Sequence, residues 1–465
     1  MPNSLRRELR AILHLAVPLV AAQLAYVVML FTDTVMMGML GPEALAAGSL
    51  GSSTYHFVSI VCVGVIAAVG SLVAIRHGAG DTQGVTRLTQ SGLWLGWGLA
   101  AISAVLLWNL EPLLRASGQQ EQNIHGATQF LSTLVLALPG YMTFMVLRGF
   151  TSAIGHPGPV MAISVGGAVA NFVLNYALIK GWLGLPALGL AGIGLVTAIV
   201  MTGMALLLGW YVLRHPAYRQ YPLKQGLFSP KMSDIRELLR LGTPIGGTYA
   251  VEAGLFTFAA LCMGALGSHE LAAHQIAIMS VYVVFMIPVG ISYAATFRIG
   301  QHYGADRLSE ARLAGRLAIS LGAACMLLVA CLFWFAPQWV IGLFLDKADS
   351  NYTEVVALAI GMLAIAAWFE LFDGIQNIAM GAIRGLKDAK TTFFVGLVCY
   401  WGVGAPLAWV LTFPLGWGAE GVWWGLAAGL ACAAIGLTLG FEWKTARLMR
   451  PSSNPNHCGI TEPPV

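Results

Sequence analysis

Long apolar runs separated by short polar stretches dominate the pattern of hydrophobic and polar positions along this chain. About twelve of these runs are long enough for an α-helix to cross a bilayer, which takes about 20 mostly apolar residues. Several are longer than a straight span needs, which predicts tilted or kinked helices. The expected spans are residues 11–40, 47–77, 91–110, 125–152, 158–180, 188–213, 238–266, 272–302, 314–336, 353–383, 392–413 and 421–446. The pattern therefore predicts an all-α integral membrane protein.

The composition supports this interpretation. Of the 465 residues, 57% are hydrophobic and only 10% are charged, and the mean hydropathy is +0.74. A soluble domain carries about 25% charged residues, so this chain has too few to coat a soluble core. The first apolar run is too long for a cleaved signal peptide, and we expect it to remain as a span.

The positions of the basic residues predict the orientation of the chain. If the N-terminus is cytoplasmic and the spans alternate in direction, 22 of the 25 Lys and Arg residues lie in cytoplasmic segments. Only Arg115, Lys180 and Lys347 lie on the other side. This split follows the positive-inside rule and predicts that both termini are cytoplasmic. It places Arg148 and Arg384 in cytoplasmic segments, leaves no basic residue deep in the membrane, and excludes a nucleic-acid-binding face.

An internal repeat divides the chain into two halves. LGTPIGG at 241–247 matches LAVPLVA at 15–21, and MGALGSHELAAH at 263–274 matches MGMLGPEALAAG at 37–48, both at an offset of 226 residues. Each half holds six spans, so both halves enter the membrane from the same side and we expect a pseudo-two-fold axis along the membrane normal. The expected divisions are an N-terminal lobe at 1–213, a cytoplasmic linker at 214–237, a C-terminal lobe at 238–447 and a disordered cytoplasmic tail at 448–465.

Four acidic residues fall inside the predicted spans, namely Asp33, Glu252, Glu370 and Asp373. An ionised carboxylate at mid-membrane costs about 2.5–3.5 kcal/mol on insertion scales. One interpretation is a permanently protonated acid that joins helices by hydrogen bonds. The other is a cation or proton site, because a medium of low dielectric favours the neutral acid and lets it exchange protons near neutral pH. The pattern leaves both interpretations open.

Polar neighbours accompany these carboxylates. Asn171 and Asn175 are four residues apart, so they share one face of the fifth span and are placed to donate hydrogen bonds to Asp33. The alternative is a hydrogen bond between helices with no ion involved. In the tenth span, Gln376 follows Asp373 by three residues.

Two prolines occupy equivalent positions of the repeat. Pro18 and Pro244 lie inside the first and seventh spans. Proline removes a backbone donor and kinks a helix, so we expect both to act as hinges. A static bend is the alternative at either position.

No assembled catalytic motif occurs in the sequence. The zinc-protease HExxH, the nucleotide-binding GxxxxGK[ST] and the serine-hydrolase GxSxG patterns are all absent. We therefore expect no enzyme activity, no resident cofactor and no bound transition metal. Any transport should be driven by an ion gradient rather than by ATP bound to this chain.

Four segments in combination resemble a known family. They are TDTVMMGMLG at 32–41, AVANFVLNY at 168–176, YAVEAG at 249–254 and IRGLKDAK at 383–390. Together they resemble the MATE (multidrug and toxic compound extrusion) exporters, in particular the bacterial NorM-type branch and its Pseudomonas members. The likeness covers essentially the whole chain to about residue 447.

The resemblance implies an architecture and an activity. It implies two six-helix bundles with a cavity between them. It also implies export of small amphipathic organic cations, such as dyes and fluoroquinolone-like antimicrobials, by alternating access in exchange for H⁺ or Na⁺. The expected setting is the bacterial inner membrane, where we expect a multi-pass monomer.

The resemblance further implies a set of cation- or proton-binding residues. The helix-one acid of the family falls on Asp33, and its helix-five asparagines fall on Asn171 and Asn175. The acids of helices seven and ten in the C-terminal lobe fall on Glu252 and Asp373.

One departure from the family pattern bears on the coupling ion. Sodium-coupled members carry Tyr-Gln where this chain has Phe369 and Glu370. The missing phenol oxygen and the added acid favour H⁺, with Na⁺ at Glu252 and Asp373 as the alternative, and make Phe369, Glu370 and Gln376 accessory candidates. A related flippase for a lipid-linked substrate is the remaining alternative. Such a protein is expected to line its cavity with Arg and Lys, and the predicted surface location of the basic residues argues against it.

The charge pattern predicts which loops are reached from outside the cell. A cysteine introduced between positions 346 and 350 should react with a membrane-impermeant thiol reagent in intact cells, because that loop is expected on the outer side. A cysteine introduced between 220 and 230 should react only after lysis. Labelling of the second position in intact cells would contradict the orientation.

Overall fold

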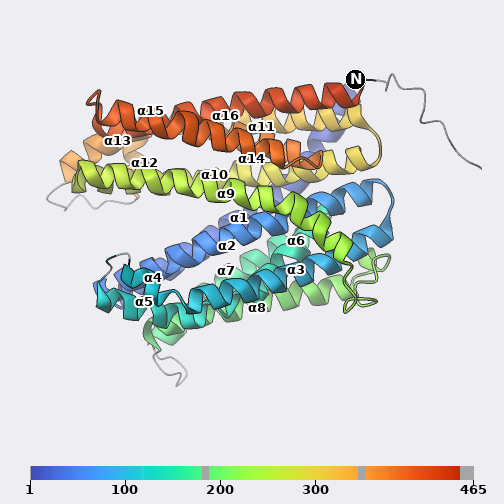
Figure 1. The fold of residues 1–465 in the computed structure, drawn as a ribbon, viewed down its shortest axis with the longest axis horizontal. Coiled ribbons are helices and arrows are strands. Elements are labelled where there is room, and N and C mark those ends of the chain that lie inside the picture. The colour runs from blue at the N-terminus through green and yellow to red at the C-terminus, as the bar shows by residue number, and fades with distance from the viewer. Residues whose placement is uncertain (1, 117, 119, 181–187, 344–351, 451–465) are drawn as a thin grey trace, which may run out of the picture.

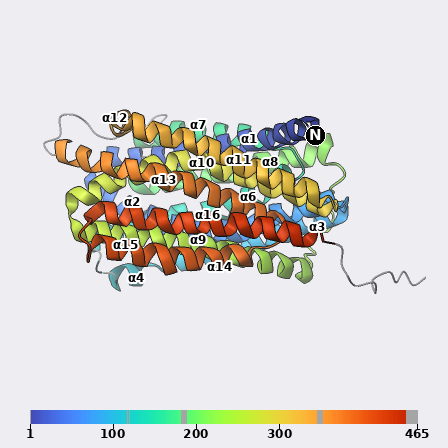
Figure 2. The same cartoon turned by 90° about the horizontal axis from the view of Figure 1, so that it is seen from above.

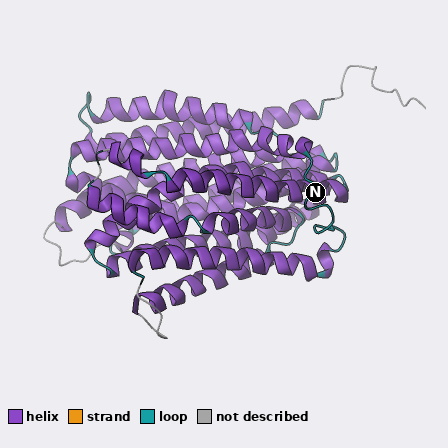
Figure 3. Cartoon of the chain, turned by 60° about the horizontal axis from the view of Figure 1, so that its bottom comes forward, coloured by secondary structure: helices purple, strands orange, loops and turns teal. Residues whose placement is uncertain are grey.

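Helices account for all the regular structure in the computed structural model, which describes residues 2–116, 118, 120–180, 188–343 and 352–450 (Figure 3). The first half holds α1 (Pro2–Met39), α2 (Pro42–Gly78), α3 (Thr82–Trp108), α4 (Glu111–Ala116), α5 (Glu121–Leu134), α6 (Ala137–Ala153), α7 (Gly158–Lys180) and α8 (Gly189–Arg214). After the short 3₁₀ turn η2 (Pro216–Tyr218), the second half holds α9 (Met232–Leu266), α10 (Ser268–Gly304), α11 (Leu308–Phe335), α12 (Pro337–Ile341), α13 (Tyr352–Gly385), α14 (Lys390–Leu397), the π-helical segment η3 (Val398–Gly404), α15 (Ala405–Thr412) and α16 (Gly418–Leu448). Most of the predicted tail, from residue 451 onward, lies outside the described residues.

These helices supply the twelve spans that the hydrophobic pattern predicts. Eleven helical stretches of the described residues are long and apolar enough to cross a membrane. The twelfth is formed by α5 and α6, which pass the same test together but meet at a bend of 50°. Pro139 lies in the first turn of α6, so the fourth expected span is broken into two helices just before it. Helix also replaces part of the predicted linker, because α9 begins at Met232 rather than at residue 238.

The helices form two bundles, one built from α1–α8 and the other from α9–α16 (Figure 1). Seen from above, the long helices of both run in roughly the same direction (Figure 2). The repeat is visible in the backbone, because α2 and α10 are both 37 residues long and their ends are 226 positions apart. Each is followed by a left-handed residue at the same repeat position, Gly80 with φ 74° and Asp306 with φ 58°. Aspartate tolerates this region better than most residues, so the turn keeps its geometry although the residue differs.

The two bundles touch along a seam in which α2 packs against α9 and α10, and α1 packs against α10. Glycines allow the close approach. A Cβ atom on Gly64 would lie 2.6 Å from the Cα of Gly246, and one on Gly78 would collide with the carbonyl oxygen of Gln301. Backbone therefore meets backbone across the seam, and a larger residue at these positions would push the lobes apart.

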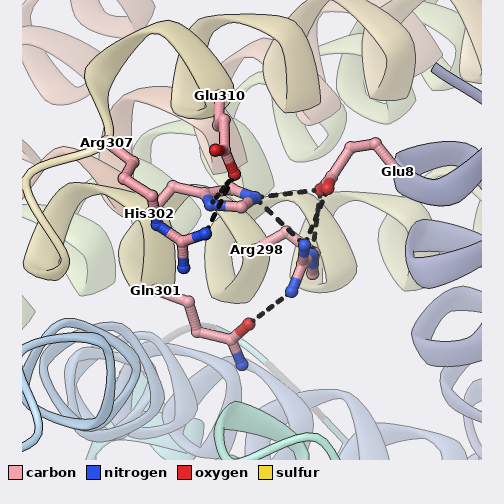
Figure 4. Close-up of polar contacts among 6 residues, drawn as sticks. All are labelled: Glu8, Arg298, Gln301, His302, Arg307 and Glu310. Carbon is pink, nitrogen blue, oxygen red and sulfur yellow. Dashed lines mark hydrogen bonds and ion pairs between the residues drawn. The ribbon is translucent and has the colours of Figure 1, made fainter. Parts of the chain in front are cut away.

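A cluster of polar side chains joins the bundles where α1 begins and α10 ends (Figure 4). Glu8 of α1 accepts two hydrogen bonds from Arg298 of α10, from Nε at 2.9 Å and from Nη2 at 2.7 Å. His302 lies 3.2 Å from the same carboxylate, and its other ring nitrogen lies 3.2 Å from Glu310 of α11. Arg298 also donates to Gln301. The paired geometry and the burial of Glu8 make this a strong contact between the lobes.

The polar linker between the halves is docked on the first bundle. Gln90 of α3 donates to the carbonyl oxygens of Leu223 at 3.0 Å and Gln225 at 2.7 Å. Trp94, one turn further along α3, donates to the carbonyl oxygen of Leu227 at 2.6 Å. The linker therefore belongs structurally to the first lobe.

Two arginines are more buried than the charge pattern predicts. Arg148 in α6 and Arg384 in α13 are only 6% and 5% exposed. Both are packed among neighbouring helices rather than exposed at the surface, whereas their assignment to the cytoplasmic side stays a prediction. Basic residues are therefore not confined to the surface, and their placement no longer counts against a flippase.

Replacing Glu8 with Gln should lower the free energy of unfolding by about 1–3 kcal/mol, because it removes a charge-assisted pair and leaves Arg298 partly buried without its partner. The measurement is the apparent melting temperature of the purified protein in detergent. Glu310→Gln is the matched control. Its carboxylate side chain is 48% exposed, so we expect a loss below about 1 kcal/mol. Equal losses in the two variants would contradict a tether at Glu8.

Candidate functional site

Asp33 lies near the end of α1 and is only 9% exposed. Its Oδ1 accepts hydrogen bonds from the side-chain amide of Asn171 at 3.1 Å and from that of Asn175 at 2.7 Å. Both amides come from α7, where their spacing of four residues puts them on the same face. The contact of both asparagines with Asp33 that the spacing predicts is therefore present in the structure.

A third donor, which the sequence pattern does not indicate, comes from α8. The hydroxyl of Thr197 lies 2.9 Å from Oδ2 of Asp33. It also lies 3.2 Å from the carbonyl oxygen of Ile193 in its own helix, the usual partner of a threonine in an apolar helix. A threonine inside an apolar helix is therefore only a weak indication of a functional site. Asp33 has three uncharged donors, and no basic side chain of the described residues pairs with it.

The two asparagines that bond Asp33 each have an unpaired oxygen. The amide oxygens of Asn171 and Asn175 are buried and accept no hydrogen bond in the described residues. Leaving a buried acceptor unpaired costs about 1–3 kcal/mol. Each of these oxygens belongs to an amide whose nitrogen bonds Asp33. The group offers oxygen atoms to a proton or to a cation.

A second group of acids lies in the C-terminal bundle. Glu370 and Asp373 lie on α13 and Glu252 on α9, and Asp373 interacts electrostatically with both of the others. Asp373 is 2% exposed and accepts a hydrogen bond from Gln376 at 2.9 Å. Arg384 interacts electrostatically with Glu252 but forms no ion pair with it. The structure thus brings together the C-lobe acids that the sequence singles out.

Tyr400 adds a phenol to this acidic group. Its hydroxyl donates to the side-chain oxygen of Gln376 at 2.5 Å, and the residue interacts electrostatically with Glu252 and Asp373. It lies in η3, and π-helical segments of this kind are frequent at functional sites. Phe369 on α13 has no phenol oxygen. Tyr400 therefore supplies one to the C-lobe acidic group from a different helix. The only sequence signal was a tyrosine inside an apolar span.

Glu370 has an environment unlike that of Asp33. Its side chain is fully buried, and neither carboxyl oxygen has a hydrogen-bond partner in the described residues. Its neighbour Phe369 belongs to the aromatic core, with its ring 5.4 Å from that of Trp423 and 6.1 Å from that of Phe256. A bare carboxylate there would cost several kcal/mol, so Glu370 requires a proton or a bound cation.

The two expected hinges lie on helices that carry members of the acidic groups, Pro18 with Asp33 on α1 and Pro244 with Glu252 on α9. Pro18 is inside α1 and Pro244 is inside α9. Pro18 is 15 residues from Asp33, which is about 22 Å along the helix. Any effect of a bend at Pro18 on Asp33 must therefore pass along α1.

Comparison with known proteins accounts for the repeat. The family model MatE matches residues 18–177 and 244–410, two stretches whose starts differ by the offset of the repeat. The chain belongs to the MATE family. This MATE transporter is 66% identical over 444 residues to the "Probable multidrug resistance protein NorM" of Pseudomonas syringae pv. tomato, which covers 96% of each chain. It is 67% identical over 442 residues to the protein of the same name from Pseudomonas aeruginosa, covering 95% of this chain and 91% of that one. The predicted resemblance to the NorM-type branch is confirmed.

Solved MATE structures share the fold. The eukaryotic MATE transporter AtDTX14 superposes with a TM-score of 0.85 at 22% identity, over 96% of this chain and 99% of that one. A multidrug resistance MATE transporter in an outward-facing conformation gives a TM-score of 0.86 at 21% identity, over 96% and 97%. These similarities confirm the predicted architecture of two related six-helix bundles, and membership of this family places the chain among transporters rather than enzymes.

Replacing Glu370 with Met should raise the free energy of unfolding by about 1–3 kcal/mol, because it removes a buried carboxyl that has no partner and fills a similar volume with an adaptable apolar side chain. The measurement is the apparent melting temperature in detergent without Na⁺. Glu370→Gln is the matched control, which keeps an unpaired polar group and should stay within about 1 kcal/mol of the wild type. A less stable Glu370→Met variant would show that the carboxyl has a partner such as water or an ion.

Proposed function

We propose that this protein is a secondary active multidrug exporter that moves amphipathic organic cations out of the cell in exchange for H⁺. The names of its Pseudomonas relatives, each a probable multidrug resistance protein, support the substrate class. One observation carries the choice of ion. Asp33 is a buried carboxylate with three uncharged donors and no cationic partner in the described residues.

The surroundings of Asp33 suit both of its protonation states. When it is ionised, two amides and a hydroxyl stabilise its charge without neutralising it, so a cationic substrate or a proton supplies the counter-charge. When it is protonated, its O–H needs an acceptor, and the unpaired amide oxygens of Asn171 and Asn175 provide one nearby. A group that gains and loses a proton in every transport cycle requires partners in both states.

Protonation of Asp33 from outside removes the charge that attracts the cation, and the substrate leaves. The membrane potential adds about 2.3 kcal/mol per charge for each 100 mV, so one proton supports a useful concentration ratio. In the C-terminal lobe, Glu252 and Asp373 repel each other when both are ionised, so the pair retains a proton or a cation. Bending of α1 at Pro18 and of α9 at Pro244 would transmit these changes to the lobes.

Na⁺ coupling is the second candidate, and the C-lobe acidic group favours it. Asp373 interacts electrostatically with Glu252 and Glu370, and the phenol of Tyr400 interacts with Glu252 and Asp373, although no three acids of the described residues are close enough to form a metal site as they stand. Hard cations prefer such oxygen ligands. Dye efflux from proteoliposomes distinguishes the two ions when a pH gradient and a Na⁺ gradient are imposed separately. H⁺ coupling predicts efflux with the pH gradient alone, and efflux only with Na⁺ would reject it.

Replacing Asp33 with Asn should reduce dye efflux driven by a pH gradient to the level of protein-free liposomes, because an amide of the same size cannot exchange a proton. Asp33→Glu should retain part of the activity with a shifted pH optimum. The control is Glu111→Gln, which neutralises a carboxylate on α4 that is 49% exposed and should leave efflux near the wild-type level. Normal efflux by Asp33→Asn under a pH gradient would mean that Asp33 is a packing residue.

A further inference from the structure

Arg148 is a buried cation that the proton cycle does not use. It lies on α6 of the first lobe, close to the seam, and is 6% exposed. No carboxylate of the described residues forms an ion pair or a hydrogen bond with it. Burying a guanidinium without a counter-charge is costly, so its presence calls for a compensating partner.

The contacts of Arg148 satisfy only part of its guanidinium. Nη1 donates to the side-chain oxygen of Gln23 on α1 at 2.7 Å. The guanidinium carbon lies 4.8 Å from the ring centre of Tyr293 on α10, a cation–π contact across the seam. Nη2 is buried and has no hydrogen-bond partner in the described residues. One nitrogen of a charged, rigid donor group is therefore left free.

Arg384 shows that a buried arginine in this protein can be fully bonded. Its Nε donates to the carbonyl oxygen of Met380 at 3.3 Å, Nη1 to the hydroxyl of Tyr249 at 3.0 Å and Nη2 to the hydroxyl of Ser292 at 3.1 Å. All of these partners lie in the C-terminal lobe. Arg384 joins helices within one lobe, and the free nitrogen of Arg148 is not a general cost of burying arginine in this fold.

A small cavity lies beside Arg148 in the seam. Its volume is about 20 Å³, enough for about one water molecule. Residues of both lobes line it: Ile66 and Gly70 of α2, Met145 and Arg148 of α6, and Tyr293 and Phe297 of α10. The walls are otherwise aromatic or aliphatic, so an arginine is the one charged group there. Because the walls come from both lobes, the cavity must widen when the lobes part.

We propose that Arg148 binds the carboxylate of a zwitterionic amphipathic substrate, such as a fluoroquinolone, while the aromatic walls take its rings. The planar guanidinium matches a carboxylate in shape and charge. Gln23, which accepts a hydrogen bond from Arg148, is ten residues from Asp33 on α1, so the Cα atoms of Gln23 and Asp33 are about 15 Å apart along the helix. One extended zwitterion can thus place its negative end at Arg148 and its positive end toward Asp33. This inference rests on the proposed export of amphipathic drugs and adds a residue that selects among them.

The test compares binding of norfloxacin with binding of its methyl ester, which keeps the rings and the amine but lacks the carboxylate. Equilibrium dialysis with the purified full-length protein in detergent gives both dissociation constants without any ion gradient. The wild type should bind the acid about tenfold or more tightly than the ester, the usual gain from a charge-assisted hydrogen bond. Arg148→Gln should bring the ratio of the two dissociation constants close to one. Arg148→Lys should give an intermediate ratio, because lysine keeps the charge but lacks the paired N–H donors of the guanidinium group.

Arg384→Gln is the matched control, because it removes a buried arginine whose nitrogens are all bonded. It should change the two dissociation constants by the same factor and keep the acid-to-ester ratio. If the wild type does not prefer the acid over the ester, the proposal is wrong, and the cavity is then a site for water or chloride. An unchanged ratio in Arg148→Gln would overturn the proposal too, and if that variant does not fold, an unchanged ratio in Arg148→Lys has the same meaning. Since binding is measured without a gradient, failure of H⁺-driven efflux would reject the coupling and leave this result standing.

Discussion

Close backbone contact between the two lobes is the constraint on which the other features of this transporter depend. Helices in a bilayer gain little from apolar burial against one another, so small residues that let backbones approach supply much of the packing. Gly64 against Gly246 is such a contact. The closeness of the seam also brings the guanidinium of Arg148 onto the ring of Tyr293 and brings Glu8 within reach of Arg298. Both contacts gain strength because the packed helices exclude water.

The two lobes share helices but not the chemistry of their acids. In the first lobe one carboxylate, Asp33, has three donors. In the second lobe Gln376 donates to Asp373, and neither carboxyl oxygen of Glu370 has a partner in the part of the chain that the structure describes. The first arrangement stabilises a single charge, whereas the second holds more acid than its surroundings can ionise at once. In the proposed mechanism, the second lobe therefore has the greater need for protons or for a cation, and the first responds to the substrate.

The features that could be predicted from the sequence are those set by the bilayer and by local spacing. The thickness of the hydrocarbon region fixes span length, so hydrophobic runs predict the helices, and the four-residue spacing of Asn171 and Asn175 puts both on the face that meets Asp33. Thr197 and Tyr400 were missed because their roles depend on which neighbouring helix each side chain faces. The burial of Arg148 was missed because the positive-inside rule assigns a charge to one side of the membrane and takes no account of the helices that pack around it.

The docked linker limits how the lobes can move. Its carbonyl oxygens at Leu223, Gln225 and Leu227 are bonded to α3, so this stretch travels with the first lobe. Only the chain from Leu227 to Met232 is left to reach the start of α9. Five steps between successive Cα atoms extend to about 18 Å at most. However the lobes rearrange, the beginning of α9 must stay within that distance of the point where Leu227 is bonded to α3. This part of the molecule therefore acts as a pivot. Large displacements between the lobes must occur at the end away from the linker.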